Sequence, residues 1–263
     1  PGPSQAAPGL VASIVPDEGS DADKLAVLHA VLGLYARELL DIQKLRVAQG
    51  NRVAAMERDG LPDEFIVFAR DTLEMLEKKE RALGAYLAKQ AKRHFLAPWI
   101  LEQRGIGLPG FARLLGITGP LDQFTTVSKL WKYLGLAVIN GSSERRVKGV
   151  KLSYSPAGRV LCHQLGESIV KMGKGGEYRR VYDEKRADYF GRERTGPSGC
   201  PTGQTHKTKE GTLIACVKRS ETGVETSAHL HAMARRYSVK RLLRRMWIEW
   251  RRVQRENRDA SAV

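Results

Sequence analysis

The sequence predicts a mainly α-helical protein. In long stretches, apolar residues recur every three or four positions, the spacing that places them on one face of a helix. Glycine and proline lie between these stretches, where they end one helix and begin the next. Residues 211–217 instead combine β-favouring side chains with turn signals, which suits a two-stranded ribbon. We therefore expect a long helical hairpin, a helix-hairpin-helix domain, a small irregular or β-ribbon insert and a basic C-terminal helix.

Residues 1–22 are rich in Pro, Gly, Ala and Ser without periodicity, which predicts a flexible leader. Residues 23–98 predict a long helical hairpin or coiled coil. Its first helix runs from Asp23 to about Gln49 and ends at Gly50-Asn51, and its second begins at Pro62-Asp63 and continues to Pro98. Two interpretations stay open, namely ordinary helical core and a dimerising coiled coil. Six acidic residues fall on helix starts or polar faces, where they suit caps and the N-terminal dipole better than metal binding: Asp21, Asp23, Asp41, Asp63, Glu64 and Asp71.

Residues 99–190 begin with two glycine-rich turns around a short helix. The first is Gly105-Ile106-Gly107, and the second, Gly116-Ile117-Thr118-Gly119, begins eleven residues after the start of the first. Glycine permits positive φ and leaves no side chain between the backbone amides and a phosphate oxygen, and a helix N-terminus adds its positive dipole end. The pattern predicts a helix-hairpin-helix that holds nucleic-acid backbone at Gly105, Ile106, Gly107, Gly116, Thr118 and Gly119. A helical corner in which the glycines only turn the chain is the alternative.

The rest of this domain alternates short helices with a basic loop. Apolar spacing predicts one helix around residues 124–136, another over about 157–172 and a basic one over 178–189. Between the first two lies an extended, hydroxyl-rich segment that begins with Gly141-Ser142-Ser143. Its cations and the arginine that follows are expected to meet phosphates: Arg145, Arg146, Lys148, Lys151 and Arg159.

The order of these parts resembles a known family, the C-terminal domain of the DEDD-type insertion-sequence transposases, which are RNA-bridge-guided serine recombinases. The resemblance covers roughly residues 75–185, about two-fifths of the chain. It rests on a long helical stretch followed by Arg104-Gly105-Ile106-Gly107, Leu115-Gly116, Phe124, Leu130-Trp131-Lys132-Tyr133-Leu134-Gly135-Leu136, Ser142-Ser143, Gly158-Arg159 and Val160-Leu161.

The resemblance implies a DNA-binding domain that supplies a serine nucleophile, with Ser142 and Ser143 in the matching place. Such a serine attacks a phosphodiester and forms a covalent intermediate, and nearby cations neutralise the phosphate charge. A turn in which the two hydroxyls bond backbone groups is the alternative. The family's ribonuclease-H-like domain, with four carboxylates around Mg²⁺, has no counterpart in front of this domain. Mg²⁺ is therefore expected only if a partner or another domain supplies carboxylates.

Residues 191–263 form a basic C-terminal region with a cluster of cysteine and histidine. A structural zinc site is one interpretation, because four such side chains close a tetrahedral site. Free thiols and surface histidines are the other, since the spacing lacks a tight Cys-x-x-Cys pair. Cys162-His163 lies on a predicted helix and is expected in the core. The expected zinc ligands are Cys200, His206, Cys216 and either His229 or His231.

The final helix, about residues 228–255, has an aromatic and aliphatic stripe and many arginines on its remaining surface. Such a helix could lie along a phosphate backbone, with Arg241, Arg244 and Arg245 as contacts. A packed terminal helix with a solvated basic face is the alternative.

Charge is strongly asymmetric along the 263 residues, whose net charge is +15. The excess of Lys and Arg over Asp and Glu is +1 in residues 1–140 and +14 in residues 141–263. This distribution predicts a polyanion-binding half, with DNA or structured RNA as partner. No apolar run approaches the roughly 20 residues of a membrane span. Together with three widely spaced cysteines, this predicts a soluble, cytoplasmic protein. The resemblance further implies a nucleoid-associated protein of prokaryotic or phage type that acts in transposition or recombination, and a homo-oligomer is expected.

Three functional classes therefore follow from the sequence. The first is a DNA-binding protein of transposition or site-specific recombination, either catalytic or inactive. The second is a non-catalytic module that binds junctions or RNA and needs the glycines and arginines but not the serines. The third is a helical assembly protein that oligomerises through residues 63–97.

Overall fold

The computed structural model describes residues 20–138, 144, 148–190, 205–207, 213–215 and 227–261. The fold is mainly α, as predicted. The elements are α1 (Asp21–Arg58), α2 (Asp63–Ala91), α3 (Ala97–Leu101), α4 (Leu108–Thr118), the 3₁₀ turn η1 (Leu121–Gln123), α5 (Val127–Tyr133), α6 (Pro156–Met172), α7 (Glu177–Phe190), β1 (Thr205–Lys207), β2 (Leu213–Ala215) and α8 (Ser227–Ser261).

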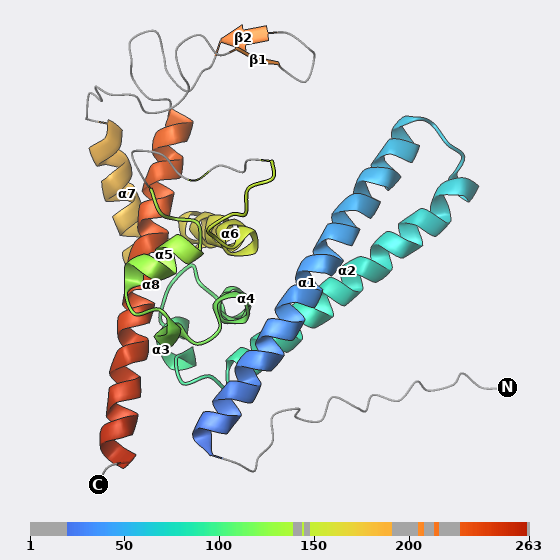
Figure 1. The fold of residues 1–263 in the computed structure, drawn as a ribbon. Coiled ribbons are helices and arrows are strands. Elements are labelled where there is room, and N and C mark those ends of the chain that lie inside the picture. Colours follow the sequence, from blue (N-terminus) through green and yellow to red (C-terminus); the bar gives the residue numbers. More distant parts are fainter. Residues whose placement is uncertain are drawn as a thin grey trace, which may run out of the picture.

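The elements form a projecting hairpin and a helical body. Helices α1 and α2 lie antiparallel and extend away from the remaining helices, whereas α8 runs along the opposite side with α7 beside it (Figure 1). Helices α3 to α6 lie between them (Figure 1). The base of the hairpin contacts the body through α4, which packs against both α1 and α2.

The first helix is longer than the sequence predicted. We expected it to end at Gly50-Asn51, but α1 continues to Arg58. A Cβ atom at Gly50 would lie 3.8 Å from Leu73 Cδ1 of α2, so this position faces the second helix. The cost of a glycine inside a helix is about 1 kcal/mol relative to alanine. Burial of Val53 against α2, worth about 1.5–3 kcal/mol, offsets that cost and keeps the helix continuous.

The ends of the hairpin helices follow local signals. Ser20 and Asp23 form a capping box, in which Asp23 N–H donates to Ser20 Oγ over 3.2 Å. The chain reverses at Gly60, whose φ of 71° lies in the left-handed region that favours glycine. Helix α2 then begins at Asp63 directly after Pro62, as predicted, and its first turn carries two acidic residues. Asp23, Asp63 and Glu64 therefore lie at a cap or in a first turn, whereas Asp41 and Asp71 lie within their helices.

Helix α2 ends at Ala91 rather than at Pro98. A turn over residues 92–96 separates it from the five-residue α3, in which Pro98 lies in the first turn. A proline is tolerated there because the first N–H groups of a helix have no acceptor within the helix. The apolar stripe of the sequence therefore spans two separate helices.

The body is held together by α4 and α8. Helix α4 buries Phe111, Leu114 and Leu115, and a glycine at position 116 lets it approach α1 closely. Helix α8 contacts α5, α6, α7 and η1. Its Ser238 hydroxyl, buried in the interface, donates to the backbone oxygen of Tyr178 in α7 over 2.6 Å. The buried face of α8 consists of Leu230, Ala234, Val239, Leu242, Leu243, Met246 and Trp250.

The two short strands pair antiparallel, with His206 opposite Ile214. Within the described ranges, no helix combines the length and the apolar character that crossing a bilayer requires.

Candidate nucleic-acid interface

The first glycine turn leads into α4 through an exposed glycine. Gly105 has a φ of 85°, and Gly107 is the N-cap of α4 with a φ of −106°, which any residue adopts. Between them, Ile106 is buried in the core. The first N–H groups of a helix lack intrahelical acceptors, and here they belong to Leu108 and Gly110, because Pro109 has none. No acidic residue lies in this first turn, so the helix end keeps its attraction for an anion.

Gly105 is required by packing as well as by its φ. A Cβ atom at this position would lie 2.9 Å from Gly173 Cα and 3.0 Å from Ile169 Cα, at the end of α6. The preceding Arg104 Nη1 donates to Lys174 O over 3.3 Å. The turn therefore lies against the glycine-rich turn that joins α6 to α7. Within this turn, Gly107 remains the candidate for contacting a phosphate, because a Cβ atom added there would meet only Pro109 Cδ, at 3.4 Å.

The second glycine turn does not offer the amides that the sequence suggested. Gly116 lies within α4, and a Cβ atom there would be 2.5 Å from Leu32 O and 2.6 Å from Ala36 Cβ. Thr118 is buried, and its hydroxyl donates to Leu114 O over 2.9 Å. The amide of Gly119 donates to Leu115 O over 2.7 Å. The expectation that Gly116, Thr118 and Gly119 hold phosphate is therefore wrong, because helix packing and C-capping already use these positions.

The serine-bearing segment itself, with Ser142, Ser143, Arg145 and Arg146, lies outside the described residues. The residues around it are placed. Lys148 and Lys151 are exposed.

Arg159 of α6 forms hydrogen bonds with Glu144 and Tyr154, which flank the undescribed residues of this segment. Its Nη1 donates to Glu144 O over 2.9 Å and to the Tyr154 hydroxyl over 3.0 Å. The Glu144 carboxylate in turn accepts from Ser153 N–H over 2.9 Å, and the hydrogen bonds from Ser153 lower the pKa of Glu144.

Beside Arg159, α8 contributes two further cations that sequence reasoning did not assign to the site. Burial lowers the pKa of Arg236, and the charge of Arg159 lowers it further. Burial and the charge of Arg236 lower the pKa of Lys240, whose Nζ lies 5.3 Å from the centre of the Trp131 ring. Within the described part of the chain, no carboxylate pairs with Arg236 or Lys240. We call Arg159, Arg236 and Lys240 the cation cluster.

The cation cluster has an electrostatic consequence. Like charges that lie together while partly removed from water destabilise one another unless an anion neutralises them. The sequence does indicate that Arg236 and Lys240 lie together, because an interval of four residues places both side chains on one side of α8. Their meeting with Arg159 depends on the packing of α8 against α6, which the sequence alone does not reveal.

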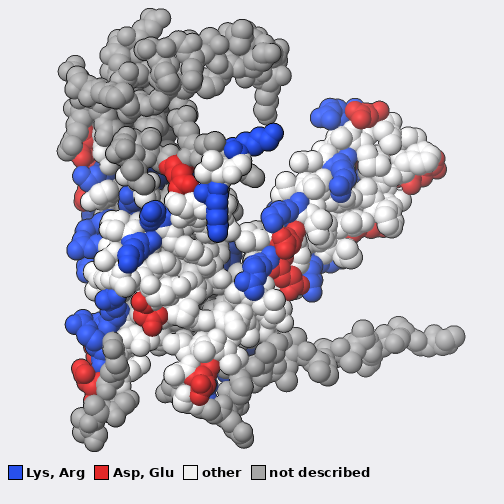
Figure 2. Space-filling view, viewed as in Figure 1, with Lys and Arg blue, Asp and Glu red and all other residues white. Residues whose placement is uncertain are grey.

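The three arginines that the sequence predicted as phosphate contacts also lie on α8. Arg244 and Arg245 are exposed, and Arg241 is half-buried. The charges of Arg245 and Arg241 act on Tyr178 of α7, whose pKa is nevertheless raised because burial dominates. Lys and Arg gather along the side of the molecule that α7 and α8 form, whereas the hairpin carries both signs of charge (Figure 2).

The expected zinc ligands are only partly placed. Cys200 and Cys216 lie outside the described residues, and His206 is described only by its backbone in β1. His231 of α8 has neighbours at both ring nitrogens, with the Tyr182 hydroxyl 2.6 Å from Nδ1 and a Glu167 oxygen 3.8 Å from Nε2. Among the residues that the structure describes, no three His, Cys, Asp or Glu side chains form a metal-binding group. His229 lies on the same helix, and zinc binding stays a prediction.

The Cys162-His163 pair divides between core and surface. Cys162 is buried in α6, as predicted, and burial raises the pKa of its thiol to about 12. His163 is exposed, contrary to expectation, because adjacent helical residues point about 100° apart.

Comparison of the chain with family models, curated proteins and solved structures yields no match.

Proposed function

We propose that this protein binds DNA and acts in DNA transposition or site-specific recombination, in the manner of the transposase domain that its sequence resembles. The observation that carries the proposal is the cation cluster. Arg159 donates to the backbone oxygen of Glu144 within the serine-bearing segment, and its charge acts on Arg236, which in turn acts on Lys240. A backbone phosphate bound there would neutralise the cluster and lie beside that segment.

In the proposed reaction, Ser142 or Ser143 is the nucleophile. Its Oγ–H loses a proton, Oγ forms a bond to phosphorus, and the bond from phosphorus to the leaving oxygen of the strand breaks. The leaving oxygen takes up a proton, and the strand remains joined to the protein as a phosphoester. Arg159, Arg236 and Lys240 would stabilise the charge that develops on the phosphate. Mg²⁺ chemistry would require carboxylates from a partner or another domain.

A second phosphate contact is proposed at the start of α4. The exposed Gly107 and the amides of Leu108 and Gly110 lie at a helix N-terminus whose first turn carries no acidic residue. Backbone amides there bind a phosphate without reading sequence, which suits a protein that holds the duplex or a junction in place.

The test of DNA binding compares the chain with an Arg236→Gln, Lys240→Gln variant on duplex DNA, a four-way junction and structured RNA over a salt series. Removing two phosphate contacts is expected to weaken binding. The negative slope of log affinity against log salt should become shallower by about two. The matched control is Lys78→Gln, Lys79→Gln, which removes the same charge from exposed positions on α2. Equal slopes in both variants would contradict the proposal, and preference for structured RNA would favour the RNA-binding module.

The serine step has its own test. A nicked or junction DNA substrate is expected to trap a covalent protein–DNA adduct, which a Ser142→Ala, Ser143→Ala variant does not form. Retention of the adduct in that variant would exclude both serines as nucleophiles. Tight DNA binding without an adduct in the unaltered protein would identify a non-catalytic binding module instead.

One observation favours self-association as an additional property. Helix α2 exposes large apolar side chains near the free end of the hairpin: Phe65, Phe68 and Met75 are 61%, 80% and 60% exposed. Recombination requires two DNA sites to meet, and contact between hairpins of two copies would join two bound DNAs. We propose that the protein acts as a homo-oligomer at the nucleoid.

A further inference from the structure

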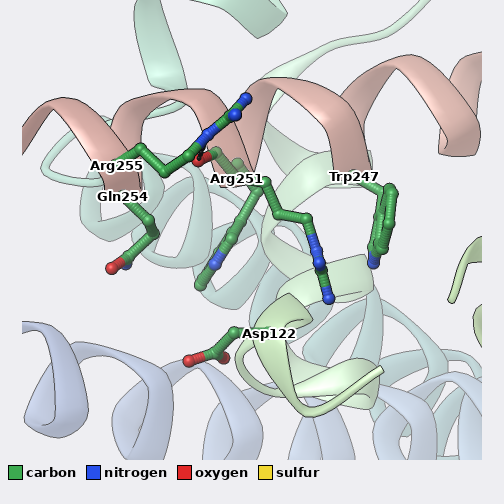
Figure 3. Close-up of a pocket in the computed structure, with 6 residues that line it drawn as sticks. Asp122, Trp247, Arg251, Gln254 and Arg255 are labelled. Carbon is green, nitrogen blue, oxygen red and sulfur yellow. Dashed lines mark hydrogen bonds between the residues drawn. The ribbon is translucent and has the colours of Figure 1, made fainter. Parts of the chain in front are cut away.

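A pocket of about 570 Å³ lies between η1 and the C-terminal half of α8 (Figure 3). Its size lies within the range of small-molecule sites. Asp122 of η1 faces Arg251 and Gln254 of α8 across it (Figure 3). The lining residues are Asp122, Trp247, Trp250, Arg251, Gln254 and Arg255.

One wall of the pocket is fixed before any ligand binds. The indole N–H of Trp247 donates to Phe124 O over 3.0 Å. The Arg251 guanidinium lies over the Trp247 ring, 4.1 Å from its centre, and donates to Phe124 O and Thr125 O over 3.4 and 3.3 Å. A planar ligand that packs against this wall therefore pays little to order it.

Two buried donors of the pocket lack acceptors. Trp250 is 1% exposed, and in the described part of the chain neither its Nε1–H nor the Nε–H of Arg251 has a hydrogen-bond partner. A buried donor without an acceptor is unfavourable, so a small side-chain shift that brings these covered groups to the acceptor atoms of a ligand is favoured. The pocket thus selects a ligand with hydrogen-bond acceptors.

The opposite side offers acceptors. Asp122 presents an exposed carboxylate there, whose two oxygens accept hydrogen bonds. A matching ligand is flat, has acceptors on one edge and donors on another, and tolerates a positive surrounding. A nucleobase with an amino group or a ring N–H has these properties. The exposed Arg255, whose Nε donates to Arg251 O over 3.4 Å, is a cation at the same pocket and could contact the phosphate of the nucleotide.

We propose that this pocket holds the base of an unpaired nucleotide. The inference rests on the proposed nucleic-acid binding and adds the chemical group that the end of α8 recognises. A base reaches such a pocket only when it is unstacked from its neighbours, as at a bulge, a junction or a strand end. A free nucleotide has the same chemistry, and the experiment separates the two sources.

The position of the pocket connects it to the cation cluster. Arg236, Lys240, Trp247 and Arg251 follow one another at intervals of four, seven and four residues, so they lie along one side of α8. The distance along the helix from Arg236 to Arg251 is about 22 Å. A strand whose phosphates contact the cluster can therefore extend along α8 and place a nearby unpaired base in the pocket.

The experiment measures the affinity of the full chain for three DNAs of one sequence. The first has a single unpaired nucleotide, the second has an abasic site at that position, and the third is fully paired. The base is expected to increase affinity roughly tenfold over the abasic DNA. Asp122→Asn should remove most of this preference without changing affinity for the paired duplex, whereas Asp71→Asn, an exposed carboxylate on α2, should retain it.

A second measurement covers free nucleotides. Each of the four deoxynucleoside monophosphates is titrated while tryptophan fluorescence is recorded, and Trp247→Phe identifies the ring that responds. Saturable quenching that the Trp247→Phe variant loses shows a pocket that also accepts a free nucleotide. Because Trp250 also lines the pocket, quenching that persists in a Trp247→Phe, Trp250→Phe double variant places the nucleotide elsewhere and overturns the proposal.

The outcomes distinguish the pocket from the proposed function. Normal, salt-dependent duplex binding with equal affinity for the unpaired and abasic DNAs overturns the pocket and leaves the proposed function standing. Absence of all DNA binding overturns the proposed function, and the nucleotide titration then decides the pocket alone. A preference for the unpaired base that persists in Asp122→Asn also overturns the assignment.

Discussion

The Nε2 atoms of His29 and His94 lie 3.2 Å apart in the core, where α1 meets the end of α2. The Leu96 N–H donates to His94 Nδ1 over 3.0 Å, so the proton of His94 is on Nε2 and donates to His29. The rings are stacked, and both contact Trp250. Protonation of either ring would place two N–H donors against each other, so the pair fits the fold only when both histidines are neutral.

This pair predicts a loss of stability in acid. Burial lowers the pKa of His29 to about 4, against a smaller opposing effect of Asp122, and lowers the pKa of His94 to about 3. The unfolded chain, with histidine pKa values of about 6.5, binds protons more readily. The free energy of unfolding should therefore fall as the pH decreases from about 6.5 toward 4, by up to about 1.4 kcal/mol per pH unit for each histidine.

Urea unfolding between pH 7.5 and 4.5 measures this slope. The control is a His29→Leu, His94→Leu variant, whose slope should be shallower because only the carboxylates and the remaining histidines contribute. Parallel pH profiles for the two proteins would show that the buried pair does not bind the protons.

Gly116 is predicted to be essential for the contact between α4 and α1. In Gly116→Ala, the new Cβ would meet Leu32 O at 2.5 Å, and overpacking of this kind costs about 1–3 kcal/mol. Gly84→Ala is the matched control, because no atom lies within 4 Å of a Cβ at that position of α2. There the higher helix propensity of alanine should stabilise by about 0.5–1 kcal/mol. Thermal unfolding of the two variants should shift in opposite directions, and a shared direction would refute the assigned packing.

The two glycines of the first turn should behave differently. Gly105→Ala is expected to destabilise the fold by about 1–3 kcal/mol, because it combines a positive φ with contact to the backbone of α6. Gly107→Glu should leave the melting temperature nearly unchanged, since its backbone is extended and its position exposed. It should nevertheless weaken DNA binding by placing a carboxylate at the start of α4. Full DNA affinity in Gly107→Glu would remove this turn from the interface.

Self-association through the hairpin can be tested at its most exposed side chains. A Phe65→Ser, Phe68→Ser variant should shift sedimentation toward the monomer, because it removes two large apolar groups from the surface of α2. Val160→Ser, at an exposed apolar position of α6, is the control and should sediment like the unaltered protein. A monomer in every case would exclude the hairpin contact.

The sequence determined what depends on neighbours along the chain. The spacing of apolar residues gave the helices, and Pro62 and Asp63 marked the start of the second helix correctly, whereas the end of the first was placed too early at Gly50-Asn51. The concentration of positive charge after residue 140 followed from composition alone. The family resemblance and the roles of Ser142 and Ser143 stay predictions, because they rest on the order of short motifs.

Only the tertiary structure decided which residues meet. Gly50 continues a helix because α2 supports it, and Gly116 serves helix packing rather than phosphate binding. Arg159 joins Arg236 and Lys240 across 77 or more positions of sequence, as His29 joins His94 across 65. Spacing along one helix predicts a face but not the surface that this face contacts. That surface is decided by the packing of all helices together, and the cation cluster and the pocket at α8 arise from it.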